Sequence, residues 1–265
     1  MTTPPSDTSL PSAPVTATPL STAPITETPL RSAPVVQLLT GDDDADLAAA
    51  RWAGSWGAAW SDASRGVRSV DDVWAARPAL VAAGIPVAGG WDAVAAAIAA
   101  GLRCEVPAVC VPWWWGALPT ARVEPHAVVV SVPETGADAV VAQAVTAARA
   151  HGGDLRLVRL WRHGRDDDED WLAERRAGEQ QVLDRALQTA RAAAPDLTLT
   201  GELRDDDAYS WLTGNEHLAS LLVLGVDDDR LSGLGHWAAT HTVAATMLVP
   251  VGAARSRRPS VAGTA

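Results

Sequence analysis

The clearest hydrophobic pattern lies between residues 123 and 252, where short apolar runs alternate with longer amphipathic stretches. The run HAVVVSV stops at Pro133 and has the length of a buried strand, and the Ala-rich stretch after it has helical spacing and stops at Gly152-Gly153. This alternation is typical of βαβ units and a parallel sheet, and continuously apolar strands indicate a sheet covered on both faces. The predicted strands are 126–132, 154–161, 196–203, 218–226 and 246–251, and the predicted helices are 137–151, 171–194, 207–217 and 231–245.

Residues 34–119 repeat the beginning and the end of that pattern but not its middle. The predicted strands here are 34–40, 78–84 and 106–112, and the predicted helices are 45–60, 69–76 and 91–102. This half is therefore shorter by about one strand-helix-strand unit. A sheet of so few strands buries little apolar surface, so we expect it to pack against the second half as an intramolecular pseudo-dimer. The expected division is a shortened repeat at 35–119 and a complete repeat at 123–252.

The two ends of the chain have a different composition. Residues 1–34 are rich in Pro, Thr and Ser and contain a loose ten-residue echo, SLPSAPVTAT, PLSTAPITET and PLRSAPVVQL. Frequent proline removes backbone donors, so we expect this segment to be a disordered, partly polyproline-II arm. A docking tail for a partner or a phosphorylated tail is the alternative for the same residues. Residues 253–265 are also expected to be disordered.

Composition excludes several function classes. The net charge of −11 and the pI of about 4.9 argue against a nucleic-acid partner and against an anionic membrane surface. The chain has no Lys, which excludes a P-loop and a Schiff-base enzyme, because both need that residue. Cys104 and Cys110 form no CxxC pair, so we expect two reduced, partly buried thiols. No apolar run reaches the roughly 18 residues of a membrane span and no signal peptide is recognisable, so a cytoplasmic location is expected.

Two motif regions give the chain a family resemblance. VVVSVPETG (128–136) stands at the start of the second repeat and LLVLGVDDDRLSGLGHWAATHTVAATMLVPV (221–251) at its end. In the first repeat the matching stretches are VVQLLTGDDD (35–44) and ALVAAGIPVAGGWDAVAAAIAAGLRCEVPAVCVP (79–112). The arrangement resembles the bacterial universal stress protein (UspA) family. The resemblance implies an α/β fold of adenine-nucleotide-hydrolase-like (Rossmann-like) repeats, a sheet order of 3-2-1-4-5, and ATP or AMP as the family ligand.

The resemblance also implies ligand positions in the second repeat. The family's repeat has an Asp after its first strand, and later G-x-x-G followed by G-[ST]. On this correspondence the ligand-contacting positions are Val132, Gly225, Gly235 and His236, while the family's Asp falls on Pro133. The second glycine of G-x-x-G falls on Asp228. In the first repeat only Gly84 fits well, with Gly89 and Gly90 nearby but out of register. The nucleotide-binding motif is therefore expected to be degraded.

Runs of three aspartates follow four of the predicted strands, at the ends where a parallel sheet binds ligands. A phosphate close to these carboxylates would lose on the order of 1 to 4 kcal/mol for each pair. Helix capping and solvation explain such runs equally well, and a Mg²⁺ or Ca²⁺ site or an unknown partner are further alternatives. The runs are Asp42-Asp43-Asp44, Asp166-Asp167-Asp168, Asp205-Asp206-Asp207 and Asp227-Asp228-Asp229.

Tryptophan and histidine positions suggest packing rather than chemistry. Trp52, Trp56 and Trp60 recur every four residues and are expected to pack onto the sheet or the other repeat, with base stacking as the alternative. Within Trp113-Trp114-Trp115, we expect at least one indole in the interface between the repeats, and an exposed one would mark a partner surface. No HExxH or GxSxG motif occurs among the histidines and serines, so no metal site or catalytic residue is predicted.

These observations favour a non-catalytic stress-response or regulatory protein that acts through a protein partner or self-association. The alternative is an ATP- or AMP-binding sensor that keeps a usable pocket in the second repeat. An enzyme of the adenine-nucleotide hydrolase type is a third possibility, but it would need a phosphate loop and a placed acid or nucleophile, and the sequence contains neither.

Overall fold

The structure is a computed structural model of the whole chain. It describes residues 35–40, 42–55, 65–67, 80–86, 91–103, 105–117, 127–162, 168–215, 219–226, 233–241 and 244–251. The predicted tails at 1–34 and 253–265, the predicted helix at 69–76, and the positions of Trp56, Trp60 and Cys104 lie outside these ranges.

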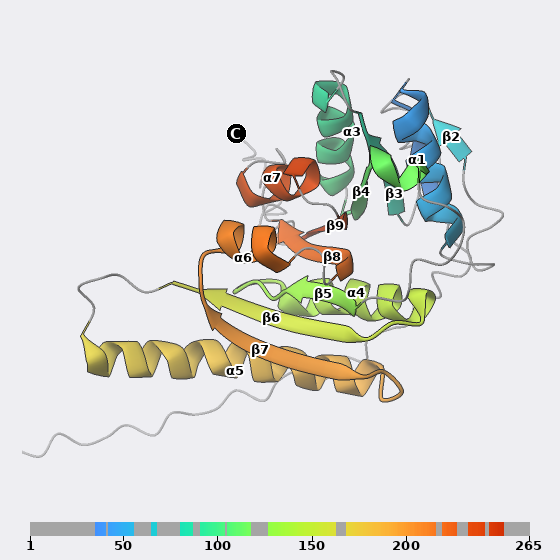
Figure 1. The fold of residues 1–265 in the computed structure, drawn as a ribbon. Helices are drawn as coiled ribbons and strands as arrows, with labels where there is room; N and C mark the ends of the chain where they lie inside the picture. Colours follow the sequence, from blue (N-terminus) through green and yellow to red (C-terminus); the bar gives the residue numbers. More distant parts are fainter. Residues whose placement is uncertain are drawn as a thin grey trace, which may run out of the picture.

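The described strands form one nine-stranded sheet in the order β2-β1-β3-β4-β9-β8-β5-β6-β7 (Figure 1). Every neighbouring pair is parallel except β4 with β9. In the second half of the chain the order β7-β6-β5-β8-β9 is the 3-2-1-4-5 order that the family resemblance implies, so the predicted fold class is confirmed. The strands are β1 (Val35–Leu38), β2 (Arg65–Val67), β3 (Leu80–Ile85), β4 (Ala108–Pro112), β5 (Ala127–Ser131), β6 (Leu155–Trp161), β7 (Leu199–Asp205), β8 (Ala219–Val226) and β9 (Ala245–Pro250).

Helices cover both faces of the sheet, which makes three layers. Alternate residues of each strand point to opposite faces, so Val128 and Val130 join one hydrophobic cluster while Val129 joins the other. The first cluster is packed under α1 (Asp43–Ser55), the 3-10 helix η2 (Trp113–Ala117), α4 (Ala137–His151) and α5 (Glu169–Ala193). The second is packed under α3 (Trp91–Arg103), α6 (Ala208–Asn215) and α7 (Gly233–His241). None of the helices in the described ranges is both long and apolar enough to cross a membrane.

The antiparallel pair β4–β9 joins the two halves of the sheet. Val109 lies opposite Met247 and Cys110 opposite Thr246, and all four residues are buried. The strands β1, β3 and β4 follow each other across the sheet as β5, β8 and β9 do. This is the arrangement expected for two repeats joined along their last strands. The exact domain boundaries at 35–119 and 123–252 stay predictions.

One expectation about the first half was wrong. We predicted that the second and third strands of the repeat are missing there, but β2 pairs with the outer edge of β1, in the place of the second strand. The three residues of β2 contain a single apolar side chain, Val67, so no hydrophobic run announces it. Backbone pairing with β1 brings this segment into the sheet.

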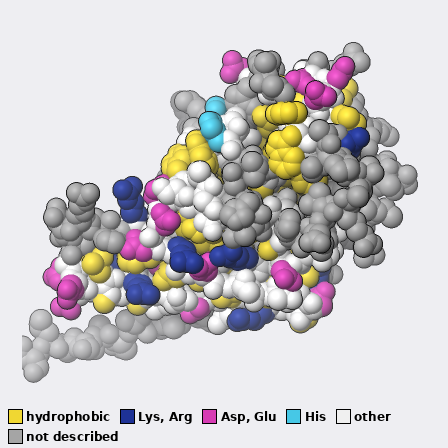
Figure 2. Space-filling view, in the orientation of Figure 1, with side chains coloured by type: hydrophobic (Ala, Val, Ile, Leu, Met, Phe, Trp, Pro, Cys, Tyr) yellow, Lys and Arg dark blue, Asp and Glu magenta, His cyan; other side chains and the backbone are white. Residues whose placement is uncertain are grey.

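The far end of the sheet is protected by charge. On β6 and β7, Arg156 and Arg204 both form ion pairs with Glu202. Figure 2 shows arginine and acidic side chains gathered over these strands. Charged side chains on the edge strand β7 disfavour pairing with a further strand, so this edge is not an open template for aggregation.

Among the described glycines, Gly84, near the carboxyl end of β3, lies closest to a neighbouring helix. A Cβ atom added to this glycine would lie 1.9 Å from the backbone oxygen of Ala45 in α1. That oxygen belongs to the helix backbone and cannot move away as a flexible side chain could. Any side chain at position 84 would therefore push α1 off the strand.

We predict that Gly84→Ala lowers the free energy of unfolding by about 3 kcal/mol, the upper end of the usual cost of overpacking, because the backbone of α1 cannot move aside as a side chain could. Gly178→Ala is the matched control: it lies within α5 with nothing within 4 Å of an added Cβ. The control is expected to stabilise the protein by up to about 1 kcal/mol through helix propensity. Urea unfolding measures both, and equal effects of the two substitutions would contradict the close approach.

Candidate functional site

The predicted ligand positions lie at the carboxyl edge of the second half but are not brought together on one face. Val132 directly follows β5 and Gly225 lies in β8, one residue beyond the paired residues Ser131 and Leu224, so these two positions are neighbours. Gly235 and His236 lie in the first turn of α7. Helix α7 packs on the opposite face of the sheet from α4. Gly235 and His236 therefore lie on one face of the sheet, while a side chain at position 225 would point to the other face.

The space over Gly225 is filled by apolar side chains. A Cβ atom at this position would lie 3.0 Å from both Pro133 and Val140 and 3.1 Å from Val251. These three side chains come from the loop after β5, from α4 and from the residue that follows β9, and the Val251 N–H is fixed by a 2.9 Å hydrogen bond to the Val226 carbonyl. Gly225 therefore serves the packing of α4 against the strands, as Gly84 serves the packing of α1.

The N-terminus of α4 is packed in the same way. Gly136 has a φ of 69° at the N-cap, in the left-handed region. A Cβ atom there would lie 2.5 Å from Cβ of Val251. Val251 thus contacts both glycine positions, and the α4 start is held close to the end of β9 by apolar contact.

The aspartate runs cap helices where the structure describes them. Asp42 Oδ1 accepts hydrogen bonds of 3.1 Å from the N–H groups of Asp44 and Ala45 in α1. Asp168 accepts one of 3.2 Å from the Asp170 N–H at the start of α5. These contacts support the capping interpretation over the metal or partner alternatives. The run at 227–229 lies outside the described ranges.

Asp207 caps α6 most completely. Its carboxylate accepts hydrogen bonds from the Ser210 hydroxyl at 2.5 Å, from the Ser210 N–H at 3.2 Å and from the Tyr209 N–H at 3.0 Å. The hydroxyl and then the N–H of Ser210 hold the pKa of this carboxyl below its usual value. The group therefore stays charged at neutral pH as a helix cap.

The aspartate runs are divided between two edges of the sheet. Because β4 and β9 are antiparallel, the carboxyl ends of β1, β3 and β4 point away from those of β5 to β9. Asp42 therefore lies at one edge, and Asp168 and Asp207 lie at the other. In the part of the chain that the structure describes, no three His, Cys, Asp or Glu side chains come together as a metal site would require.

The other candidate side chains have packing roles. Trp52 is buried beneath α1, as predicted for its stripe, and Trp115 is buried where η2 packs against α1. Trp113 is 42% exposed and is the member of its triplet that faces solvent. Cys110 is buried in β4, and burial raises the pKa of its thiol to about 12, which leaves it protonated and unreactive.

A charged cluster that we did not predict lies beside Val132. Arg159, in β6, donates from Nε to Glu179 at 2.6 Å and from Nη1 to the Val132 carbonyl at 2.9 Å. Glu179, in α5, also forms a 2.7 Å ion pair with Arg175 one turn earlier. The side chains of Arg159 and Glu179 are only 9% and 4% exposed. Two guanidinium groups thus share one buried carboxylate.

The sequence carried a signal for this cluster. Arg159 follows Leu155 and Leu157 at alternate positions of β6, where both leucines are in the core. Glu179 likewise begins the series of buried α5 positions that continues with Leu183. A charged residue at a core position requires a partner, so an Arg and a Glu at such positions could have been paired in advance.

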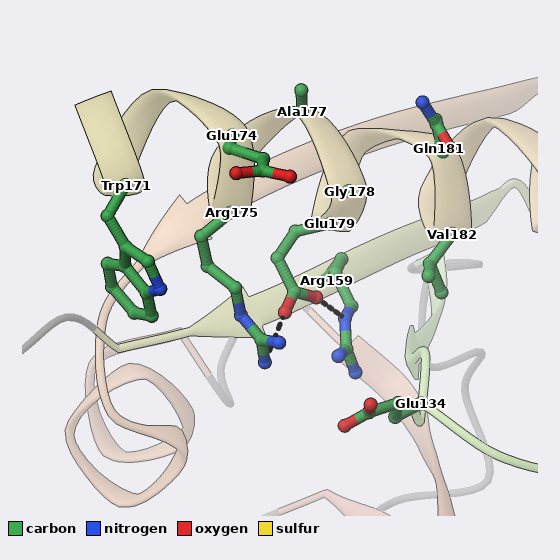
Figure 3. Close-up of a pocket in the computed structure, with 10 residues that line it drawn as sticks. All are labelled: Glu134, Arg159, Trp171, Glu174, Arg175, Ala177, Gly178, Glu179, Gln181 and Val182. Carbon is green, nitrogen blue, oxygen red and sulfur yellow. Dashed lines mark hydrogen bonds and ion pairs between the residues drawn. The ribbon is translucent and has the colours of Figure 1, made fainter. Parts of the chain in front are cut away.

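A cavity of about 630 Å³ opens beside this cluster, between α5 and the loop after β5 (Figure 3). Residues 168–178 of the chain are all exposed except the half-buried Leu172, so the first half of α5 extends past the edge of the sheet. Figure 1 shows the same overhang at the left end of α5. The lining residues are Glu134, Arg159, Trp171, Glu174, Arg175, Ala177, Gly178, Glu179, Gln181 and Val182.

Comparison with known proteins found similar solved structures but no matching family model and no matching curated protein. A putative universal stress protein from Pseudomonas aeruginosa UCBPP-PA14 aligns with a TM-score of 0.47 and 12% identity over 84% of this chain and 95% of that chain. A universal stress protein from Archaeoglobus fulgidus DSM 4304 aligns with a TM-score of 0.43 and 12% identity, over 72% of this chain and 70% of that chain. A third structure, the universal stress protein from Archaeoglobus fulgidus in complex with dAMP, aligns with a TM-score of 0.37 and 14% identity, over 48% of this chain and 99% of that chain. The fold assignment above depends on the strand order itself.

We predict that Glu179→Met lowers the free energy of unfolding by about 3 kcal/mol, because it leaves the buried Arg159 without a counter-charge. Arg159→Met should cost less, because Arg175 still pairs with Glu179. The double variant should lose less free energy of unfolding than the two single variants do in sum. The difference, which is the coupling energy of the pair, should be about 1 kcal/mol or more in urea unfolding. The exposed pair Arg149–Asp196, at 2.9 Å, is the matched control and should show a much smaller coupling. Additive effects at Arg159 and Glu179 would show that the buried pair contributes nothing as a pair.

Proposed function

We propose that the chain is a universal stress protein that acts without catalysis, as a stress-response or regulatory protein, through contacts with a protein partner or a second copy. In this proposal its nucleotide site is no longer functional. The single observation that carries the proposal is the packing of Pro133, Val140 and Val251 onto Gly225. In a phosphate-binding edge, a glycine leaves room for the ligand to approach the backbone; here the chain's own side chains take that room.

The charges near the same edge support the proposal. Asp168 and Asp207 are placed at the carboxyl edge of the second half and cap helices as carboxylates. A triphosphate approaching this edge would meet negative charge in addition to the filled space. Both effects act against ATP, and neither depends on a single substitution.

Exposed aromatic side chains support a role in protein contacts. Trp113 and Tyr209 are each more than 40% exposed. Tyr209 lies edge-on to Trp237 with ring centroids 5.3 Å apart, and Trp237 stacks on His241 at 5.5 Å. Aromatic residues are enriched at protein–protein interfaces, where they bury much area at a low entropy cost.

Isothermal titration of the intact protein with Mg-ATP and with AMP tests this proposal. We expect only heats of dilution up to about 1 mM ligand, and no shift of the unfolding transition. A ligand with a dissociation constant of about 10 μM would instead stabilise the protein by about 2.7 kcal/mol at that concentration. Such a shift, if lost in Gly225→Ala, would establish the alternative of a nucleotide sensor with a usable pocket in the second half.

A further inference from the structure

The cavity under the overhanging half of α5 is lined by groups of opposite charge that are not paired across it. Arg159 and Arg175 lie on one side and share Glu179, so these three groups carry one positive charge together, with the exposed Glu174 beside Arg175 in the same lining. Glu134 lies on the other side, in the loop after β5, and is exposed. Figure 3 shows its carboxylate below the guanidinium of Arg159, with no ion pair drawn between them.

Arg159 has donors left over. Its guanidinium offers five N–H groups, of which two donate to Glu179 and Val132. Among the described residues, no partner is found for Nη2; this nitrogen is not one of the fully buried atoms that lack a partner, so it is accessible at the cavity although the side chain as a whole is nine-tenths buried. A buried guanidinium with unused donors favours a carboxylate or another anion that completes its hydrogen bonds.

Trp171 supplies a flat surface at the end of the cavity. It lies one helical turn before Arg175, so its indole and that guanidinium project from the same face of α5. The side chain is 48% exposed, which leaves the ring available for stacking. The volume of about 630 Å³ lies within the range of small-molecule sites.

We propose that this cavity binds a small zwitterion with a flat side chain, of which an aromatic α-amino acid is the simplest case. The ligand carboxylate pairs with Arg175 and the free donors of Arg159, the ammonium group pairs with Glu134, and the aromatic ring stacks on Trp171. The inference is independent of the proposed function, because the cavity lies beside α5 rather than over Gly225. A nucleotide fits less well, because its phosphate would bring two negative charges toward Glu134 and Glu174.

Isothermal titration calorimetry of the full-length protein with phenylalanine tests the proposal. We expect saturable binding of phenylalanine. Phenylalaninamide lacks the carboxylate and N-acetylphenylalanine lacks the ammonium group, and each should bind at least about tenfold more weakly, as expected for losing a charged hydrogen bond. Cyclohexylalanine, whose ring is not flat, should also bind more weakly.

Variants show whether binding occurs in this cavity. Arg175→Gln should weaken the binding of phenylalanine by about tenfold, and the variant should no longer bind phenylalanine more tightly than phenylalaninamide. Glu134→Gln should weaken the binding of phenylalanine by a similar factor, and the variant should no longer bind phenylalanine more tightly than N-acetylphenylalanine. The matched control Arg176→Gln, which changes the exposed neighbour outside the cavity, should bind as the unaltered protein does.

Three results would overturn the proposal: no binding of phenylalanine, binding that Glu134→Gln and Arg175→Gln leave unchanged, or tighter binding of AMP that competes with phenylalanine. Arg175 contacts Glu179, so its variant could be less stable. Glu134 is exposed and, within the described part of the chain, has no ion-pair partner, so Glu134→Gln by itself decides the outcome.

Discussion

The antiparallel pairing of β4 with β9 is the interaction on which the rest of this structure depends. It converts two parallel half-sheets into one sheet in which β4 is buried along its whole length. Without β9, β4 would be an edge strand with its apolar residues and backbone groups exposed to water. Beyond β4 the first half has β3 and then only the short strands β1 and β2, which could not replace that lost burial.

The same pairing determines where ligands could bind. It places the carboxyl ends of the two half-sheets at opposite edges, so the molecule has two separated edges instead of one. At each edge a glycine, Gly84 or Gly225, is used for close packing of the helix that follows the first strand of that half. Among the described residues, an open cavity lies beside α5, where a long helix extends past the sheet and two arginines share Glu179.

Hydrophobic periodicity predicted the fold because burial and secondary structure coincide along most of the chain. The runs ending at Pro112, Pro133 and Pro250 are strands, and Gly152 ends α4 in the left-handed conformation, as the pattern indicated. The strand β2 could not be predicted, since its place depends on pairing with β1.

The candidate site was less predictable, because the identity of a motif residue does not indicate which atoms pack against it. Gly225 has the same sequence signature whether a phosphate or Val140 lies over it. The cavity follows from where α5 begins relative to the ends of β6 and β7, which no local pattern specifies. The pairing of Arg159 with Glu179 was visible only as two charges at core positions.

Thermal unfolding of residues 34–120, expressed alone, tests the central claim most directly. If β4 needs β9, this fragment shows no cooperative transition as a monomer, and adding residues 123–252 as a separate chain restores one. A cooperative transition of the isolated fragment at concentrations where it is monomeric would show that the first half folds without its partner strand, and would contradict the account.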